Sequence, residues 1–352
     1  MKRFSIAVAA ALLTAPLSAG EKPAAISPSE IVAAAPASEW VRIAAADLLV
    51  MDLAPGPKGA PRRVVIQLIP APFSQGWVGN IRKLAATHWW DGLSVYRVQD
   101  NYVAQWGDAE GESKAKARAL PAGLAVVPES EYVSRYTPAM FSRYAESGFT
   151  TVPGDAAEFF MDRPVRTEGR PPRFADPYTG NVSWAFGFPV GLKWWVERGA
   201  GGTIVKTGPD QVWPLHCYGM VGVARDLSPD TGTGAELYTV IGHAPRQLDR
   251  NIALVGRVVE GIQWLSSLPR GTGASGFYET PEERTAILSV RLASALPEAE
   301  RPRFEYLSTE SQSFVKYAEA IANRGDPFFI QPAGGADICN VRVPVRRSAS
   351  SR

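Results

Sequence analysis

A succession of short apolar runs, separated by glycine- and proline-rich turns, limits the folds that this chain can adopt. The 352 residues include 32 glycines and 29 prolines, which fall mostly between the apolar runs. Short runs of alternating or continuously apolar residues, bounded by such turns, predict β-strands rather than helices. The strand-heavy order favours a mostly β fold: a closed antiparallel eight-stranded barrel capped by two helices. We expect its strands near residues 47–52, 62–69, 93–98, 102–105, 219–224, 236–241, 254–259 and 286–293.

Two helical patterns accompany these strands. The first follows Ala71-Pro72 and runs to about residue 87, because apolar residues recur there at the spacing of one helical face, which Asn80 shares. The second is a short apolar stretch over residues 262–268. These are the two helices expected to cap the barrel.

The segment 109–215 interrupts the strand series and is expected to be a long insertion within a domain spanning 40–293. Its patterns predict short helices at 114–119 and within 136–147, a strand at 124–127 and a long loop over 162–182. Aromatic residues crowd the stretch 182–195 and favour core packing, or a docking surface, over a cofactor-binding site: Trp184, Phe186, Phe188, Trp194 and Trp195. The glycine cluster at 199–202 lacks the Lys-Ser/Thr of a phosphate-binding loop, so nucleotide binding is not predicted.

The first 20 residues have the pattern of an export signal. Lys2 and Arg3 precede an apolar run over residues 4–13, and small residues at 18–20 offer a cleavage site. The run is shorter than the roughly 20 apolar residues that span a bilayer, so a cleaved signal peptide is favoured over a membrane anchor. We expect a periplasmic or secreted protein without stable membrane insertion. Residues 21–39, rich in alanine, proline and serine, are expected to be a flexible leader.

Residues 294–352 are expected to form a C-terminal extension with one helix. The helical pattern runs over 307–322, with Ser308 as the N-cap and Gly325 as the stop. The only two cysteines, Cys217 and Cys339, can form one disulfide in an exported protein, or both can be buried free thiols. A disulfide would join the extension to the barrel domain.

Charge and histidine spacing exclude several classes of function. The net charge is +2 and no long run of like charges occurs, so the chain lacks the clustered basic surface of nucleic-acid binders. His88, His216 and His243 are isolated, without the spacing of metal ligands, and are expected in ordinary packing or surface roles. The Gly-x-Ser-x-Gly motif of serine hydrolases is absent. No cofactor is expected.

The third and fourth expected strands form the most informative stretch, a hairpin about a short polar turn. Arg97 and Gln105 are polar side chains set among apolar and aromatic neighbours, which suggests a dry groove with a few directed donors. The alternatives are that Arg97 forms a structural ion pair, with Asp108 or Glu236, and that Gln105 is a satisfied core amide.

Several ordered motifs resemble those of the cyclophilin family of peptidyl-prolyl isomerases. The family signature of Phe-His-Arg, an aromatic residue and Gln-Gly-Gly-Asp is matched by Val95-Tyr96-Arg97, Tyr102 and Gln105-Trp106-Gly107-Asp108. A second signature, Met-Ala, a Pro-Asn-Thr-Asn-Gly-Ser-Gln turn and Phe-Phe, is matched by Val223-Ala224, residues 229–236 and Leu237-Tyr238. Leu248-Asp249 and residues 255–261 match Leu-Asp and Phe-Gly-Arg-Val-Val-Glu-Gly. The resemblance covers residues 62–108 and 217–293.

The resemblance implies a role for each matching residue. Arg97 would be the catalytic arginine, Gln105 the neighbouring substrate-binding amide, and Glu236 would stand at the position of a binding glutamine. The proline pocket would be lined by Tyr102, Val103, Ala224, Tyr238 and Leu248. The chain also departs from the family: Tyr96 replaces histidine, Trp106 glycine and Glu236 glutamine, while Gln247 and Ile252 fall where members have tryptophan and, in some, histidine.

The function implied is cis–trans isomerisation of X-Pro bonds in proline-containing polypeptides, in support of protein folding. The rotation barrier of roughly 18–20 kcal/mol comes from amide resonance, and hydrogen bonds from an arginine in an apolar groove can lower it without a cofactor. Because the pocket departs from the family, the alternative is a non-catalytic cyclophilin-like module that binds proline peptides or acts as a chaperone. With either function, the insertion is a candidate docking segment for a protein partner.

Overall fold

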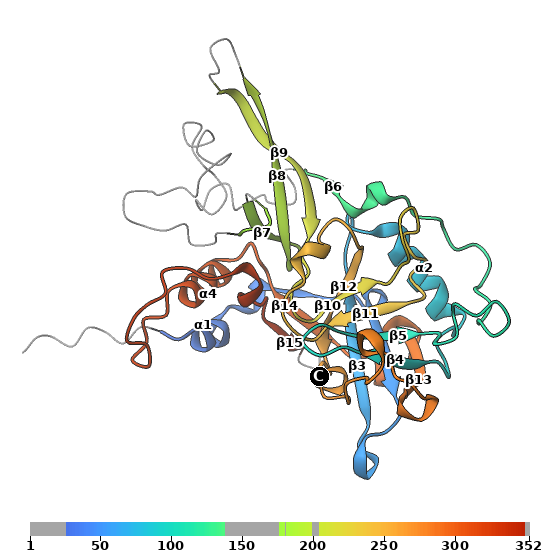
Figure 1. Cartoon of the computed structure of the whole chain (residues 1–352). Helices are drawn as coiled ribbons and strands as arrows, with labels where there is room; N and C mark the ends of the chain where they lie inside the picture. The colour runs from blue at the N-terminus through green and yellow to red at the C-terminus, as the bar shows by residue number, and fades with distance from the viewer. Residues whose placement is uncertain (1–25, 138–175, 180, 199–203, 349–352) are drawn as a thin grey trace, which may run out of the picture.

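The computed structural model describes residues 26–137, 176–179, 181–198 and 204–348, and its centre is a closed barrel of eight antiparallel strands (Figure 1). Neighbouring strands follow the order β10-β11-β5-β4-β13-β2-β3-β12, and β12 pairs with β10 to close the ring. The barrel strands are β2 (Leu48–Leu53), β3 (Arg62–Leu68), β4 (Ser94–Val98), β5 (Val103–Gly107), β10 (Met220–Val223), β11 (Leu237–Val240), β12 (Leu254–Glu260) and β13 (Thr285–Leu292). The predicted barrel is therefore confirmed.

Strand β2 shows why some barrel strands are apolar on both faces. Leu49 and Met51 belong to the main hydrophobic core. Leu48 and Val50 belong to a separate cluster that includes Phe304 of the C-terminal extension. Because side chains alternate along a strand, one face fills the barrel interior and the other is covered by the extension.

Helix α2 (Gln75–Ala86) packs on the barrel as predicted, with Trp77 fully buried, and α3 (Gln263–Ser266) is a single short turn. Asn80 on the buried face of α2 donates to the Ala125 carbonyl at 2.9 Å and accepts from the Ala125 amide at 2.7 Å. The predicted strand at 124–127 is wrong for this reason: a side chain, not a strand, satisfies this backbone. The predicted helix at 114–119 is also wrong, because the Arg118 amide donates to the Asp108 carboxylate and ends the single turn there.

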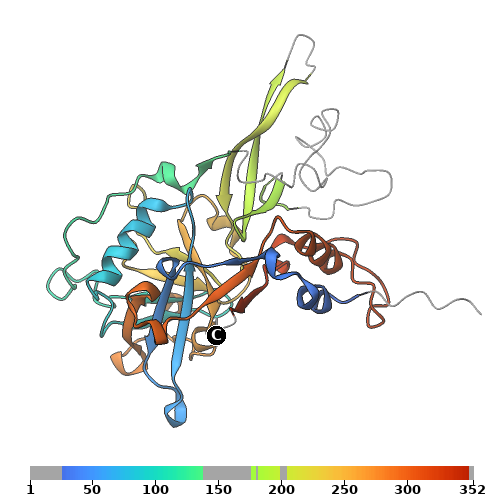
Figure 2. The same ribbon diagram turned by 180° about the vertical axis from the view of Figure 1, so that it is seen from behind.

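The insertion contributes a separate sheet with the strand order β6-β9-β8-β7. Its strands are β6 (Ser134–Arg135), β7 (Asn181–Ala185), β8 (Phe188–Arg198) and β9 (Ile204–Pro214). The β8–β9 hairpin projects away from the barrel (Figures 1 and 2). Trp184 and Phe188 are buried at 2% and 0% exposure, which confirms the core interpretation for these two aromatics. The side chains of Trp194 and Trp195, the glycine cluster and most of 136–147 and 162–182 lie outside the described residues.

The two ends of the described chain meet in a second layer beside the barrel. Strands β1 (Trp40–Arg42), β14 (Phe304–Leu307) and β15 (Val345–Arg347) form a three-stranded sheet. Helix α1 (Pro28–Ala34) packs against α4 (Gln312–Ala322), as the view from behind also shows (Figure 2). The expected flexible leader is therefore wrong over 28–34, where the Ser27–Glu30 capping box starts a helix. The C-terminal helix is confirmed, but it begins later than predicted because residue 307 ends β14 and Ser311 is the N-cap.

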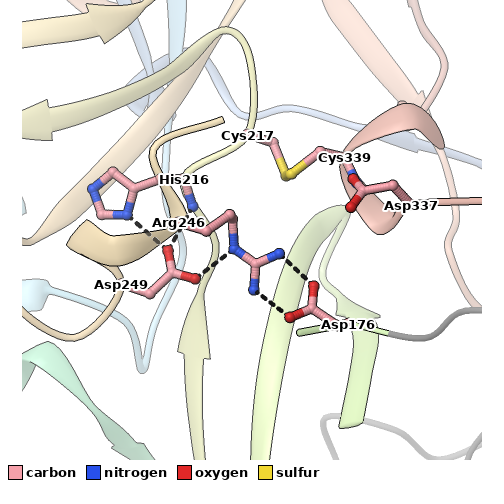
Figure 3. Close-up of a disulfide and its surroundings, with 7 residues drawn as sticks. All are labelled: Asp176, His216, Cys217, Arg246, Asp249, Asp337 and Cys339. Atoms are coloured by element: carbon pink, nitrogen blue, oxygen red, sulfur yellow. Dashed lines mark hydrogen bonds and ion pairs between the residues drawn. A yellow bond between two sulfur atoms is a disulfide. The ribbon is translucent and has the colours of Figure 1, made fainter. Parts of the chain in front are cut away.

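A disulfide joins the barrel domain to the extension, as one of the two predicted alternatives required (Figure 3). Cys217 lies just before β10, and Cys339 lies in the short 3-10 turn Ile338–Asn340. The bond spans 122 residues of sequence. It fastens the C-terminal layer to the connection between β9 and β10, which leads into the barrel.

The predicted export signal, residues 1–20, lies outside the described residues. In the ranges that are described, no helix has both the length and the apolar character needed to cross a bilayer.

Candidate active site

A β-bulge in the predicted hairpin creates the polar centre of the site. The hairpin itself is confirmed: β4 pairs with β5, with Val95 opposite Trp106 and Arg97 opposite Gln105. The register shifts between Val95 and Arg97, so that Tyr96 and Arg97 share one partner. Simple alternation would send these two side chains to opposite faces, whereas a bulge redirects one of them. Both side chains consequently reach Gln105.

Three hydrogen bonds link Arg97 to Glu236 through these residues, and a fourth, from the Asp108 amide, holds the carboxylate. Arg97 Nη1 donates to Gln105 Oε1 at 2.9 Å, and Gln105 Nε2 donates to the Tyr96 hydroxyl at 2.6 Å. The Tyr96 hydroxyl donates to Glu236 Oε2 at 2.7 Å, and the Asp108 amide donates to Glu236 Oε1 at 2.7 Å. Every donor points toward the carboxylate, an arrangement in which each bond strengthens the next. We call Arg97, Gln105, Tyr96 and Glu236 the polar relay.

Gly107 makes room for the carboxylate at the end of the polar relay. A Cβ at this position would lie 2.0 Å from Glu236 Oε2, and the φ of +147° is one that residues with side chains rarely adopt. Glycine at the end of β5 is therefore required for Glu236 to enter the site.

Burial controls the charges in the polar relay. It raises the pKa of Glu236 to about 7, against the lowering effect of the hydrogen bonds from Tyr96 and Asp108. Burial, followed by the neighbouring Glu236 charge, raises the pKa of Tyr96, so its hydroxyl keeps its proton and acts as a donor. Burial also lowers the pKa of Arg97, although a guanidinium remains protonated at neutral pH.

The Arg97 guanidinium is held from several sides. Its Nε donates to the Ser275 carbonyl at 2.8 Å and its Nη2 to Gln99 Oε1 at 2.6 Å. Its carbon lies 5.1 Å from the ring centre of Phe277 and 5.8 Å from that of Tyr102, within the range of cation–π attraction. With the bond to Gln105, three of the five guanidinium N–H groups are engaged, and the described residues provide no hydrogen-bond partner for the other two.

The alternative interpretation, an ion pair between Arg97 and Asp108 or Glu236, is not seen among the described residues. Arg97 donates to two amide side chains and a carbonyl, while Asp108 accepts from the amides of Glu110 and Arg118. Gln105 is a buried and satisfied amide, at 8% exposure, and it also contacts the arginine directly. The two interpretations of Gln105 are thus compatible.

An apolar cluster lies beside the polar relay, at the place where the resemblance puts the proline pocket. Val103, Tyr238 and Val240 form a buried cluster against which Tyr102, Ala224 and Ile252 pack. Four of the predicted pocket residues are therefore together: Tyr102, Val103, Ala224 and Tyr238. Leu248 lies in the neighbouring 3-10 turn Arg246–Leu248 and is half-buried, outside this cluster. Ile252 occupies the place where some family members carry histidine, and it makes the pocket more apolar.

A cavity of about 870 Å³ adjoins the polar relay. Its lining includes Tyr96, Gln105, Glu236, Ala224, Phe277 and residues 108–113. It is large enough for several residues of an extended peptide. Within the part of the chain that the structure covers, no group of histidine, cysteine and acidic side chains is arranged to hold a metal ion. The described side chains of the site offer hydrogen bonds and apolar contacts.

Two site residues escaped prediction from the sequence. Phe277 comes from the loop after α3. Backbone contacts, among them the Arg97–Phe277 bridge and the bond from the Tyr278 amide to the Tyr96 carbonyl, place this loop along β4. His216 was expected in ordinary packing, yet its Nε2 lies 2.9 Å from the Tyr238 hydroxyl. One sequence signal points to this contact: Tyr238 replaces a family phenylalanine, and a buried hydroxyl requires a hydrogen-bond partner.

Comparisons with known proteins agree with this geometry. A family model described as cyclophilin type peptidyl-prolyl cis-trans isomerase/CLD matches residues 63–292. No curated protein matches the chain. The crystal structure of cyclophilin AquaCyp293 from Hirschia baltica is similar with a TM-score of 0.57 and 20% identity, over 90% of this chain and 96% of that chain.

A second solved structure is more distant. It is a cyclophilin type peptidyl-prolyl cis-trans isomerase from Cryptosporidium parvum in the presence of the dipeptide Ala-Pro, with a TM-score of 0.34 and 11% identity over 69% of this chain and 98% of that one. The fold rests on the Hirschia baltica likeness, and the family rests on the model that matches more than half of the chain. The chain belongs to the cyclophilin-type peptidyl-prolyl cis-trans isomerase family.

Proposed function

We propose that this protein lowers the rotation barrier of X-Pro bonds by hydrogen bonding from Arg97, and that it assists the folding of exported polypeptides. The observation that carries the mechanism is the fixed guanidinium, which is bonded to the cavity-lining Gln105 and lies over the ring of Tyr102. Export is proposed from the signal pattern of residues 1–20, and the disulfide is compatible with an oxidising compartment.

The mechanism follows from the electronic structure of the amide. During rotation, resonance is lost and the nitrogen lone pair of the proline becomes localised. A guanidinium N–H directed at that nitrogen interacts more strongly with the twisted state than with either planar isomer, and only such differential binding raises the rate. The ring would sit on Tyr102, Val103 and Tyr238, while Gln105 holds the guanidinium and faces the cavity. No covalent bond is formed or broken.

Glu236 takes a positioning role in this mechanism, not the substrate-binding role that the resemblance implies. Both of its oxygens accept hydrogen bonds from within the protein, from Tyr96 and from the Asp108 amide. Its carboxylate orients Tyr96, which in turn orients the Gln105 amide so that Gln105 Oε1 faces Arg97.

The pH dependence of activity is expected to report this role. Above pH 7 Glu236 is a carboxylate and accepts from Tyr96; below pH 7 it becomes protonated, donates instead, and the direction of the polar relay is disturbed. Wild-type kcat/KM should fall by roughly fivefold as the pH is lowered through about 7, the effect expected of about one lost hydrogen bond. The measurement is a pH–rate profile with a chromogenic proline tetrapeptide.

Two variants make this pH test specific. Glu236→Gln should flatten the profile, while Glu110→Gln should keep it, because Glu110 lines the same cavity but contacts Lys116 and Arg284. An unchanged profile in Glu236→Gln would assign the titration to another group.

A non-catalytic module that binds proline peptides is the second candidate. Two features favour it. The rings of Phe277 and Tyr102 flank the guanidinium, and the Glu236 carboxylate is already hydrogen-bonded within the protein. This module would bind a proline tetrapeptide with Arg97-dependent affinity and give no acceleration over buffer. Docking of a protein partner through the insertion stays a proposal. Trp184 and Phe188 are buried, so these two aromatic side chains could not contact such a partner.

A further inference from the structure

The hydroxyl of Tyr238, whose ring belongs to the apolar cluster, requires a hydrogen-bond partner inside the protein. The ring of Tyr238 contributes to the pocket, but its hydroxyl lies over β10, where a Cβ on Gly222 would be 2.3 Å from the hydroxyl oxygen. Gly222 is the cross-strand partner of Tyr238 and leaves space for this hydroxyl. At 4% exposure, Tyr238 cannot direct the hydroxyl to solvent, so a protein partner is required.

His216 is that partner, and Asp249 fixes its orientation. His216 Nδ1 lies 2.9 Å from Asp249 Oδ1, and Nε2 lies 2.9 Å from the Tyr238 hydroxyl. A carboxylate can only accept, so Nδ1 carries a proton, and in the neutral imidazole Nε2 is then an acceptor for the Tyr238 hydroxyl. Burial raises the pKa of Tyr238 well above its ordinary value, which keeps the hydroxyl protonated as a donor.

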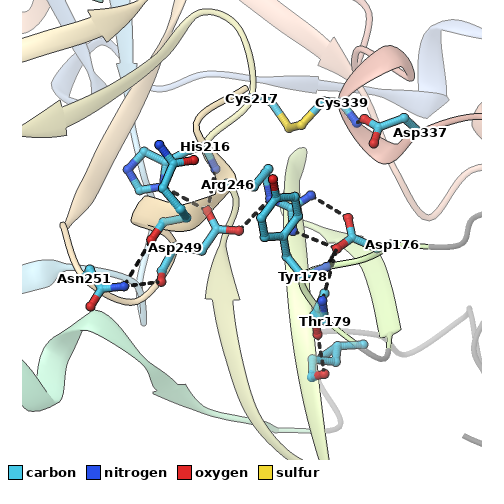
Figure 4. A network of polar contacts seen from close by, with 12 residues as sticks. Asp176, Tyr178, Thr179, His216, Cys217, Arg246, Asp249, Asn251, Asp337 and Cys339 are labelled. Atoms are coloured by element: carbon cyan, nitrogen blue, oxygen red, sulfur yellow. Dashed lines mark hydrogen bonds and ion pairs between the residues drawn. A yellow bond between two sulfur atoms is a disulfide. The ribbon is translucent and has the colours of Figure 1, made fainter. Parts of the chain in front are cut away.

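Asp249 is itself held by an arginine and by the insertion. Arg246 Nε donates to Asp249 Oδ2 at 2.6 Å, and Arg246 Nη2 donates to Asp176 Oδ1 at 3.2 Å (Figure 4). The side chains of Arg246 and Asp176 are 3% and 1% exposed. A buried ionic network of this kind is costly to disturb on one side, because the remaining charge loses its partner. It therefore forms a rigid support behind the pocket.

The backbone of His216 is also fixed. Its amide donates to Asp249 Oδ1 at 2.9 Å, and the next residue, Cys217, is disulfide-bonded to Cys339 (Figure 3). The imidazole ring stacks beside the Tyr238 ring, with centroids 6.4 Å apart and planes inclined by 13°. The position of the histidine ring is thus determined from its backbone, from Nδ1 and from Nε2.

We propose that His216 is a positioning residue of the proline pocket: it holds the Tyr238 ring through its hydroxyl, and the Asp249–Arg246–Asp176 network holds His216. This rests on the proposed function, since it assigns the Tyr238 ring to the bound proline. His216 acts on substrate affinity and leaves the rotation step at Arg97 unchanged. The insertion, through Asp176, thereby contributes to the shape of the pocket.

Two replacements of the histidine separate its two contacts. An asparagine amide reproduces the place of Nδ1 and keeps Asp249 satisfied, whereas a glutamine amide reproduces the place of Nε2 and can still bond Tyr238. We expect His216→Asn to raise both KM and the dissociation constant of a proline tetrapeptide by roughly fivefold, with kcat within about twofold of wild type. His216→Gln should recover most of the affinity.

A double-mutant comparison shows whether the effect passes through the hydroxyl. In the Tyr238→Phe background, His216→Asn should cause no further rise in the dissociation constant, measured by NMR titration at temperatures where every variant is folded. Equal rises in both backgrounds, or no rise in either, would overturn the proposal. Peptide affinity is measured independently of turnover. An inactive wild type would count against the proposed isomerase function, while the affinity comparison would still decide the role of His216.

Discussion

Replacing Arg97 with alanine is expected to lower kcat/KM for a proline peptide by about 10²–10³-fold, because the alanine removes the preorganised donor to the twisted amide. The loss should appear mainly in kcat, since the donor acts on the twisted state more than on the bound peptide. The fold should persist, because Gln105 keeps its bond to Tyr96 and the barrel strands are paired through the backbone. The measurement is a protease-coupled assay of cis-to-trans isomerisation.

Two further arginine variants sharpen this test. Arg270→Ala removes an exposed arginine that bonds Asp100 at 3.0 Å and should leave the rate unchanged. Arg97→Lys keeps the charge but cannot reproduce the planar fork that bonds Gln105, Gln99 and Ser275 together, so its rate should stay close to that of Arg97→Ala. Full activity in Arg97→Lys would show that charge alone suffices.

Removing the disulfide is expected to cause the largest loss of stability. In the chain-entropy model, a bond that closes a loop with a sequence separation of 122 lowers the entropy of the unfolded chain enough to contribute about 5 kcal/mol. The paired variant Cys217→Ala with Cys339→Ala should lose about this much free energy of unfolding. Urea unfolding followed by tryptophan fluorescence measures it.

Chemical reduction of the disulfide in the wild-type protein is the matched control for the paired variant. Dithiothreitol should bring the wild type to the stability of the paired variant and should not change the variant further. Equal stability of oxidised wild type and paired variant would show that the extension is held by its packing against the barrel, through clusters such as the one around Phe304, without help from the bond.

The sequence was sufficient for the barrel but not for the arrangement of its polar centre. Alternation over residues 93–98 predicts that Tyr96 and Arg97 face opposite ways, and the bulge between Val95 and Arg97 brings both to Gln105. A bulge adds one residue to one strand without leaving a pattern that alternation can reveal. The motif resemblance singled out Arg97, Gln105 and a set of apolar residues, and the fold brings Arg97 and Gln105 close to four of these: Tyr102, Val103, Ala224 and Tyr238.

Contacts between distant segments account for most of the errors. The stretch 124–127 is apolar enough for a strand, yet Asn80 of α2 takes its backbone groups. The segment 28–34 is alanine-rich and looks like a linker, but α4 supplies the surface on which it packs as a helix. The packing role expected of His216 is borne out, but its partners Asp249 and Tyr238 could not be named from the sequence because they are distant along the chain. Each outcome depends on a partner far along the chain.

Isomerisation of X-Pro bonds at this site can be tested directly. The most direct measurement is the rate of cis-to-trans isomerisation of a proline tetrapeptide at increasing concentrations of the purified wild-type protein. The account predicts a rate that rises linearly with protein concentration and is lost in Arg97→Ala. A rate equal to that in buffer at every concentration, from protein that is folded and binds the peptide, would contradict it.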